Sequence, residues 1–390
     1  MKLIGMEGSL AVAEAVRLAD TDVVAAYPIT PQTHIVERLA EMVANGELDA
    51  EYIPVESEHS AMSACLGSSA TGARTFTATA GQGLELMHEV LYIPSSLRLP
   101  IVMAVANRAL SAPLSVWGDH SDVMAVRDCG WIQTFAENGQ QAFDLTLCAF
   151  RIAEDPEVLF PVMVHLDGFH LSHVVEPLSL LGKSDVDKFL PPYHYPRALD
   201  PDTPVTIGAL ALPNVYSETK MSQDVAFTST KPAILRTWKE FGDMSGRYYE
   251  PVEHYQSEDA KVLLLTMGSY SETAMVAVDE LREEGEKVGL IRLRLWRPFP
   301  FEELRQAVEG AEVLVILDRC ISFGGPPGPV CSEVKAAFYS QEKRPRIVGF
   351  IGGLGGRDIS VGEFRQMVAR GMESAARGAE EETYMIGVRE

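Results

Sequence analysis

The sequence predicts an α/β protein of two domains, the first of them doubly wound around a mostly parallel sheet. Short apolar runs typical of buried strands alternate with stretches of helical period, first between residues 8 and 166 and again from residue 261. A weakly patterned stretch with prolines at positions 177, 191, 192, 196, 201 and 204 separates the two series. Because 390 residues exceed one ordinary core, we place domains at residues 1–235 and 258–390, with an extended segment from about residue 173.

The first series alternates regularly from strand to helix. A helix start is predicted at Thr30, because a threonine hydroxyl can cap a helix and Pro31 is tolerated at the first helical position. The strands are expected over residues 23–29, 52–55, 75–80, 101–106, 130–136 and 160–166, and the helices over residues 8–20, 30–46, 60–72, 84–91 and 140–152.

The second series has the same alternation, and one stretch of the first domain has none. Strands are expected over residues 262–267, 288–295, 313–317 and 346–351, and helices over residues 271–284, 301–308, 330–339 and 361–376. Residues 109–128 lose all periodicity but are rich in polar and small side chains. Long segments of this kind inside compact domains are usually functional, so we expect a site there.

Charge and cysteine spacing exclude several functions. The 33 basic against 55 acidic residues give a net charge of -22, which disfavours nucleic acid or an anionic membrane as a partner. No leader is seen and no apolar run approaches about 18 residues, so we expect a cytoplasmic protein that does not span a membrane. Cysteines 65, 129, 148, 320 and 331 are spaced too widely for a metal ribbon or an iron–sulfur cluster, and they are expected to be reduced and mostly buried.

Glycine-rich segments at residues 81–83, 324–328 and 352–356 lack the context of a nucleotide fold. None combines strand, G-x-G-x-x-G, helix and a distant acidic residue, and none carries the lysine of a phosphate-binding loop. We therefore interpret them as structural turns or as parts of a cofactor lid.

Several polar residues have two readings when each is taken alone. Glu56 and Glu58 flank one serine, so one carboxylate should turn inward while the other is solvated, although Glu58 could simply complement the dipole of a helix start. Arg108 ends a buried strand, where its guanidinium could grip a carboxylate ligand or close a salt bridge. His120 and His170 are expected to be hydrogen-bonded structural histidines.

Six segments distributed over the chain form a specific joint pattern. They are YPITPQT (27–33), ESEHSA (56–61), NRALSAP (107–113), WGDHSD (117–122), LDGF (166–169) and GLGGRD (353–358). Together they resemble the alpha subunit of 2-oxoacid:ferredoxin oxidoreductases, most closely that of pyruvate:ferredoxin oxidoreductase, over essentially the whole chain. The resemblance implies a thiamine-diphosphate-binding, pyrimidine-type doubly wound domain followed by a transketolase C-terminal-like α/β domain.

The resemblance also implies roles for particular residues. Glu58 would be the carboxylate that hydrogen-bonds the pyrimidine nitrogen of thiamine diphosphate and promotes loss of its C2 proton. Arg108 and Thr30 would hold the carboxylate of the 2-oxoacid, with the loops at residues 111–116 and 118–122 lining the pocket. The implied cofactor-binding residues are Tyr27, Pro28, Ile29 and Glu58.

One expected feature is missing from the chain. Enzymes of this type bind the diphosphate and its metal with a glycine-aspartate-glycine turn and a later asparagine, but here His120 replaces the second glycine and Asn138 is too near. The resemblance therefore implies that a beta subunit completes the cofactor site. It implies Mg²⁺ and [4Fe-4S] clusters on partner subunits, gamma and delta subunits, coenzyme A as co-substrate and ferredoxin as electron acceptor.

The implied function is reversible oxidative decarboxylation of pyruvate to acetyl-CoA and CO₂ in a complex of several subunits. A subunit acting on branched-chain or other 2-oxoacids is the nearest alternative, although Thr30 in place of a second basic residue argues against a dicarboxylate substrate. A scaffold that keeps the fold without activity is a further alternative. Retention of both Glu58 and Arg108 disfavours it.

Overall fold

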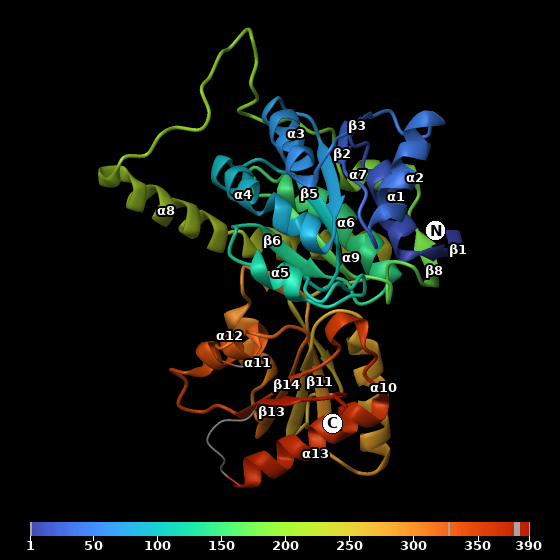
Figure 1. Cartoon of the computed structure of the whole chain (residues 1–390), viewed down its shortest axis with the longest axis vertical. Helices are drawn as coiled ribbons and strands as arrows, with labels where there is room; N and C mark the ends of the chain where they lie inside the picture. Colours follow the sequence, from blue (N-terminus) through green and yellow to red (C-terminus); the bar gives the residue numbers. More distant parts are fainter. Residues whose placement is uncertain (1, 327, 378–382, 390) are drawn as a thin grey trace.

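The computed structural model describes residues 2–326, 328–377 and 383–389. Two sheets of seven and six strands are stacked along the long axis of the molecule, and a separate two-stranded sheet lies beside the first (Figure 1). The sheets and helices confirm the predicted α/β class. The division into residues 1–235 and 258–390 stays a prediction, because one short strand from the second part joins the sheet of the first.

The seven-stranded sheet has the order β12-β6-β7-β5-β4-β2-β3. Its strands are β2 (Val23–Ala26), β3 (Glu51–Pro54), β4 (Thr75–Thr79), β5 (Val102–Asn107), β6 (Ile132–Phe135), β7 (Val162–Asp167) and β12 (Leu295–Arg297). All neighbours are parallel except β12, which runs antiparallel to β6. The carboxyl ends of β3, β2, β4 and β5 therefore meet along one side of the sheet.

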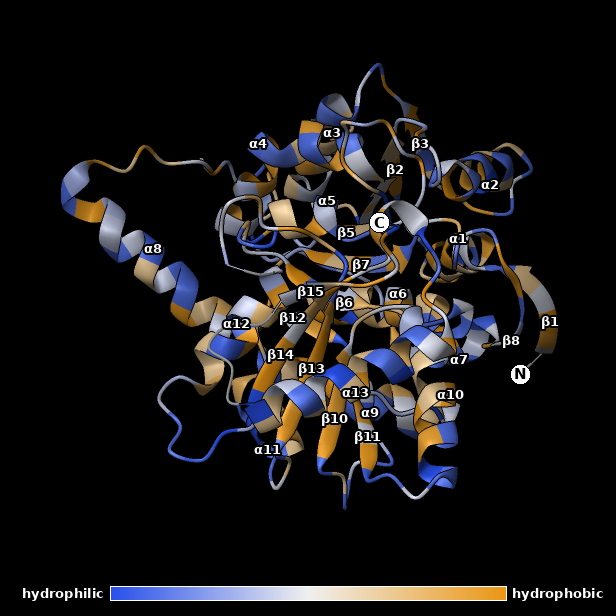
Figure 2. Ribbon diagram, turned by 60° about the horizontal axis from the view of Figure 1, so that its bottom comes forward, coloured by the Kyte–Doolittle hydropathy of each residue, from blue (hydrophilic) through white to orange (hydrophobic). Residues whose placement is uncertain are grey.

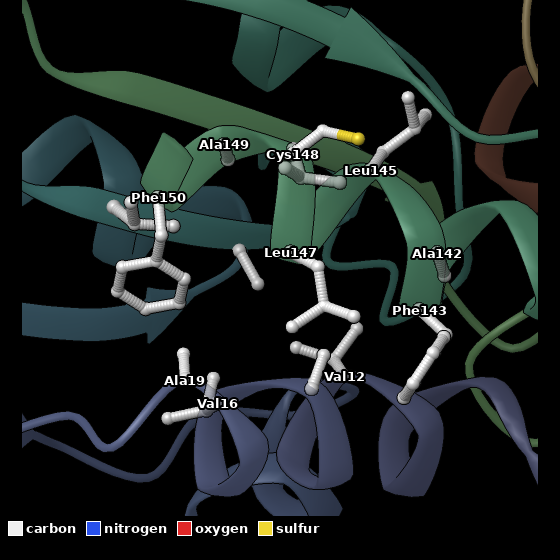
Figure 3. Packing of buried hydrophobic residues seen from close by; sticks show 14 of the residues in the cluster. Val12, Val16, Ala19, Ala142, Phe143, Leu145, Leu147, Cys148, Ala149 and Phe150 are labelled. Carbon is white, nitrogen blue, oxygen red and sulfur yellow. The ribbon is translucent and has the colours of Figure 1, made fainter. Parts of the chain in front are cut away.

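Helices cover both faces of this sheet and bury apolar side chains against it. They are α1 (Gly8–Leu18), α2 (Thr33–Ala44), α3 (Glu58–Ala70), α4 (Gly81–Leu97), α5 (Ser121–Ala125) and α6 (Gly139–Ala153). Figure 3 shows Val12 and Val16 of α1 facing Leu147 of α6 across the interior. Burial of each such side chain contributes roughly 1.5–3 kcal/mol to folding, so this contact anchors the first domain.

The six-stranded sheet has the order β15-β14-β13-β10-β11-β9 and is parallel except for β9. Its strands are β9 (Val252–Tyr255), β10 (Val262–Thr266), β11 (Val288–Leu293), β13 (Val313–Asp318), β14 (Arg346–Ile351) and β15 (Thr383–Met385), and its helices are α10 (Tyr270–Glu283), α11 (Phe301–Ala307), α12 (Pro329–Phe338) and α13 (Val361–Arg377). Figure 2 shows these central strands as continuous hydrophobic runs. Such runs are typical of parallel strands that are buried on both faces, so the predicted arrangement is confirmed.

The segment from about residue 173 was predicted to be extended, and this is wrong where it forms three helices. It forms β8 (Val175–Leu180), which pairs with β1 (Lys2–Glu7), and the helices α7 (Lys183–Phe189), α8 (Pro213–Thr228) and α9 (Lys231–Ser245). The prolines at the starts of α8 and α9 are compatible with a first helical turn, so they mark helix starts and do not exclude helices. None of the residues of α8 is buried, and the helix projects from the body of the molecule (Figure 1).

The helix predicted to start at Thr30 begins three residues later, at Thr33. The Gln32 backbone N–H donates to the Ile29 carbonyl over 2.8 Å, and the Thr30–Pro31 peptide is cis. A turn therefore separates the end of β2 from α2, and that turn carries four of the residues expected at the site.

The expectation for the cysteines holds in the part of the chain that is described. All five cysteines are buried and none forms a disulfide, as predicted for structural thiols. No helix in the described ranges has both the length and the apolarity that a bilayer crossing requires.

Candidate active site

Three predicted site residues and one of the glycine turns follow the carboxyl ends of four neighbouring strands. Tyr27 comes directly after β2, Glu58 shortly after β3, Gly81 after β4 and Arg108 directly after β5. Ligands of parallel α/β sheets bind at this end of the strands. The topology therefore brings together residues that are separated by up to 81 positions in the sequence.

Glu58 lies in the first turn of α3 and is 5% exposed. Burial raises the pKa of its carboxyl group. Among the described residues, no other side chain donates a hydrogen bond to this carboxylate. Glu56 is exposed and accepts from the Ser60 hydroxyl, so the prediction that one of the two carboxylates turns inward and the other is solvated is confirmed. Glu58 is thus a buried acid whose hydrogen-bonding capacity is available to a ligand.

The glycine turn at the start of α4 separates Glu58 from Arg108. A Cβ atom on Gly83 would lie 2.5 Å from Thr79 Oγ1 and 2.6 Å from Glu58 Oε1. Gly81 has φ +47°, and a Cβ there would lie 3.0 Å from Arg108 Cδ. Both glycines are required because the two functional candidates pack against the turn from opposite ends.

Arg108 is 7% exposed, and within the described part of the chain its guanidinium bonds to backbone carbonyls alone. Nε donates to the Ser115 carbonyl over 2.9 Å and Nη1 to the Thr30 carbonyl over 3.1 Å. No carboxylate among the described residues forms an ion pair with it, and burial lowers its pKa although Asp122 opposes this. Arg108 and Thr30 are therefore in contact, and the guanidinium charge is left for an anionic ligand.

The loop at residues 27–32 is held by Gln32, which sequence reasoning missed. Gln32 is fully buried; its Oε1 accepts from the Ile29 N–H over 3.3 Å, and its Nε2 donates to the carbonyls of Ala78 and Tyr27 over 2.6 and 3.4 Å. Tyr27, Pro28 and Thr30 are exposed on this loop. A lone glutamine after a proline gives no periodic signal, so only the folded structure identifies its role.

A buried network between the domains supports the loop at residues 117–122. Arg319 pairs with Asp167 and donates from Nη2 to the Gly118 carbonyl over 2.9 Å. His120 Nε2 lies 3.1 Å from Asp167 Oδ1, and the Ser269 N–H donates to Asp167 Oδ2 over 2.7 Å. Burial would raise the pKa of Asp167, but Arg319 and His120 outweigh it and hold the pKa well below its usual value. His120 is a structural histidine, as expected.

The glycine loop of the second domain also contacts the loop at residues 117–122. The Gly355 N–H donates to Asp119 Oδ2 over 3.0 Å, and a Cβ on Gly356 would lie 2.4 Å from Trp117 Cβ. His170 Nε2 lies 3.1 Å from the Gly356 carbonyl oxygen, again a structural contact. The loop at residues 353–356 is therefore a structural turn that docks against the loop at residues 117–122 of the first domain.

Models of two protein families match consecutive parts of the chain. The model described as pyruvate flavodoxin/ferredoxin oxidoreductase, thiamine diphosphate-binding, matches residues 14–236, and that of the pyruvate:ferredoxin oxidoreductase core domain II matches residues 260–364. The first match includes Tyr27, Thr30, Glu58 and Arg108. It covers more than half of the chain.

Curated relatives match over nearly the full length. The pyruvate synthase subunit PorA of Thermotoga maritima is 49% identical, with 99% of this chain and 98% of the relative covered, and that of Methanothermobacter thermautotrophicus is 48% identical, with 95% of each covered. The ketoisovalerate oxidoreductase subunit VorA of Pyrococcus abyssi is 46% identical, with 92% of this chain and 91% of the relative covered. Similar identity to relatives of different name means that identity alone does not fix the 2-oxoacid.

Solved structures share the fold at low sequence identity. The 2-oxoglutarate:ferredoxin oxidoreductase of Magnetococcus marinus superposes with a TM-score of 0.72 at 20% identity, covering 96% of this chain and 65% of that chain. A split-gene transketolase superposes with a TM-score of 0.56 at 13% identity, covering 95% of this chain and 99% of that chain. With the family matches and the near-full-length relatives, these findings show that the chain belongs to the pyruvate:ferredoxin oxidoreductase family and contains its thiamine-diphosphate-binding domain.

Proposed function

We propose that the chain is the alpha subunit of a pyruvate:ferredoxin oxidoreductase, which oxidatively decarboxylates pyruvate with coenzyme A to acetyl-CoA and CO₂ and passes two electrons to ferredoxin. The observation that carries the proposal is the pairing of two buried groups on either side of one glycine turn. Among the described residues, Glu58 has no side-chain donor and Arg108 has no carboxylate partner in an ion pair. Both side chains are prepared for a ligand that is not protein.

The residues present are suited to the pyrimidine end of thiamine diphosphate. Gly83 packs directly against the Glu58 carboxylate, because a Cβ there would lie 2.6 Å from Glu58 Oε1, and so helps to fix the position of this acid. When bound, the cofactor supplies an acidic thiazolium C–H and an electron sink for decarboxylation. Glu58 would hold a proton at the pyrimidine nitrogen, and its raised pKa favours sharing of that proton. Tyr27, Pro28 and Ile29 would form the adjoining wall.

Arg108 and Thr30 would position the substrate. A guanidinium fixed by two backbone carbonyls has lost most of its rotational freedom, so it can grip a carboxylate at a smaller entropic cost than a free side chain. The exposed Thr30 hydroxyl adds a second polar group on the same side. The pair would orient the 2-oxoacid with its carboxylate toward Arg108.

Partner subunits would supply the remaining parts of the enzyme. In the described ranges, no group of three or more histidine, cysteine, aspartate or glutamate side chains is arranged to hold a metal ion. Asp119, the aspartate of the incomplete glycine-aspartate-glycine turn, is engaged by Ser121 and Gly355. We propose that a beta subunit binds the diphosphate and Mg²⁺, that [4Fe-4S] clusters lie on partner subunits, and that gamma and delta subunits complete the complex.

Substitution of Glu58 tests the proposal. In the assembled complex, Glu58→Gln and Glu58→Ala should lower turnover of pyruvate about 10²–10⁴-fold, the usual contribution of one acid–base group. Glu56→Ala is the matched control, since its carboxylate is two residues away and exposed, and it should keep parental turnover. Parental turnover in an assembled Glu58→Ala complex would refute the assignment.

The alternative substrate class is tested in the same preparation. The 46% identity to a ketoisovalerate oxidoreductase subunit keeps branched-chain 2-oxoacids as a second candidate. Assay of the complex against a panel of 2-oxoacids with a low-potential dye should give the highest kcat/KM with pyruvate. A higher value with a branched-chain substrate would replace the proposed substrate, and absence of turnover with bound cofactor would favour the scaffold alternative.

A further inference from the structure

Asp122 is a fully buried residue of the candidate active site and lies in the five-residue helix α5. Its Oδ2 accepts from the backbone N–H of Arg108 over 2.9 Å and from that of Gly81 over 3.1 Å. Its Oδ1 accepts from Asn107 Nδ2 over 2.9 Å and from the Val123 N–H over 2.7 Å. The Asp122 side chain thus joins the ends of two neighbouring strands, β4 and β5, to the loop at residues 117–122.

The two donors to Oδ2 belong to the two halves of the candidate site. The Arg108 N–H fixes the backbone that carries the guanidinium. The Gly81 N–H fixes the first turn of α4, whose Gly83 packs against Glu58. A single carboxylate oxygen therefore links the backbone of Arg108 to the helix turn that packs against Glu58.

The chemistry of the four donors requires the ionised carboxylate. All four partners are N–H groups, so a proton or an amide NH₂ on Asp122 would face a donor and break at least one of the bonds. No lysine, arginine or histidine among the described residues forms an ion pair with Asp122, and burial raises its pKa to about 7. Burying a charged group costs free energy unless hydrogen bonds offset the loss of water. The four N–H donors therefore explain why an aspartate can occupy this buried position.

We propose that Asp122 is a positioning residue for the reaction, which sets the separation of the cofactor-binding Glu58 and the substrate-binding Arg108. The inference rests on the proposed function. It predicts that an isosteric loss of the charge affects substrate binding and turnover more than it affects folding.

The test compares Asp122→Asn with Asp318→Asn in the assembled complex. Asp318 is an equally buried aspartate in the second domain that accepts from the Val330 and Cys331 N–H groups over 2.8 and 2.9 Å, and burial raises its pKa to about 7 as well. At a temperature where both variants are folded, Asp122→Asn should raise the KM for pyruvate and lower kcat, with kcat/KM reduced roughly 10- to 100-fold. Asp318→Asn should be less stable yet keep parental kcat/KM.

The outcomes separate this inference from the proposed function. Turnover of pyruvate by the parental complex tests the function, and unchanged kinetics of a folded Asp122→Asn complex would overturn only the positioning role. An equal kinetic loss in Asp318→Asn would also overturn it, because the effect would then be general. If the Asp122→Asn complex does not assemble, Asn107→Ala provides the test, because it removes one of the four donors to Asp122. A several-fold rise in the KM for pyruvate would then support the inference, and parental kinetics would overturn it.

Discussion

Replacement of Gly83 by alanine perturbs Glu58 without altering its chemistry. The new Cβ would lie 2.6 Å from Glu58 Oε1 and 2.5 Å from Thr79 Oγ1. The Glu58 carboxylate is the far end of a flexible side chain and can move, whereas Thr79 is held in place at the end of the buried strand β4. Glu58 should therefore retreat by about 0.8 Å to restore the 3.4 Å at which ordinary contact begins.

The size of the effect follows from this displacement. A shift of about 1 Å in a catalytic group can cost roughly 10²-fold in rate, so we expect kcat to fall roughly 10- to 100-fold. Overpacking a buried contact costs about 1–3 kcal/mol, and loss of a flexible glycine from a helix returns about 0.5–1 kcal/mol. The free energy of unfolding should fall by about 1–2 kcal/mol.

Turnover of pyruvate by the assembled complex and urea unfolding of the chain measure the two effects. Gly67→Ala is the matched control, because Gly67 lies in the same helix as Glu58 and a Cβ there meets nothing within 4 Å. It should raise the free energy of unfolding by about 0.5–1 kcal/mol and leave turnover unchanged. Parental turnover in Gly83→Ala would refute the placement of Glu58 beside the cofactor.

Three further predictions concern the site and the contact between the domains. Arg108→Ala should mainly raise the apparent KM for pyruvate, measured in steady-state assays, and an unchanged KM would remove it from the pocket. Arg319→Met leaves the Asp167 carboxylate without its cation, so the free energy of unfolding in urea should fall by about 3–5 kcal/mol, whereas Arg377→Met, at an exposed ion pair, should change little. Because Arg319 and His120 depress the pKa of Asp167, the parental chain keeps the stability contributed by this carboxylate until the pH falls below the ordinary value of 3.8, whereas in Arg319→Met burial raises that pKa. The difference between the two chains should therefore be largest at neutral pH and shrink as the pH falls, and a difference that grows on acidification would contradict this account.

The alternation of strands and helices could be predicted because parallel strands buried on both faces read as apolar runs. The pairing of β1 with β8 could not, since the partners lie more than 160 residues apart and neither has a distinctive pattern. Strands β12 and β15 have three residues each, too few for a period. Helix α8 was missed because a helix that buries nothing shows no apolar stripe.

At the site, the sequence identified residues but not their supports. Glu58 and Arg108 stood at the ends of predicted strands within recognisable segments. Asp122 was expected only to end a loop that lines the pocket, because its partners at positions 81 and 107–108 become neighbours only when β4 and β5 pair. Arg319 likewise acts on a loop two hundred positions earlier. Contacts of this kind depend on topology, which local patterns do not encode.

Strand β12 has a consequence for attempts to divide the chain. It pairs with β6, with Leu295 opposite Thr134, and so covers a strand that would otherwise be the edge of the first sheet. A fragment that ended at residue 235 would leave the amides and carbonyls of β6 open to pairing with other molecules, the usual origin of aggregation. Such a fragment should be insoluble, and a soluble one would have to extend through Arg297.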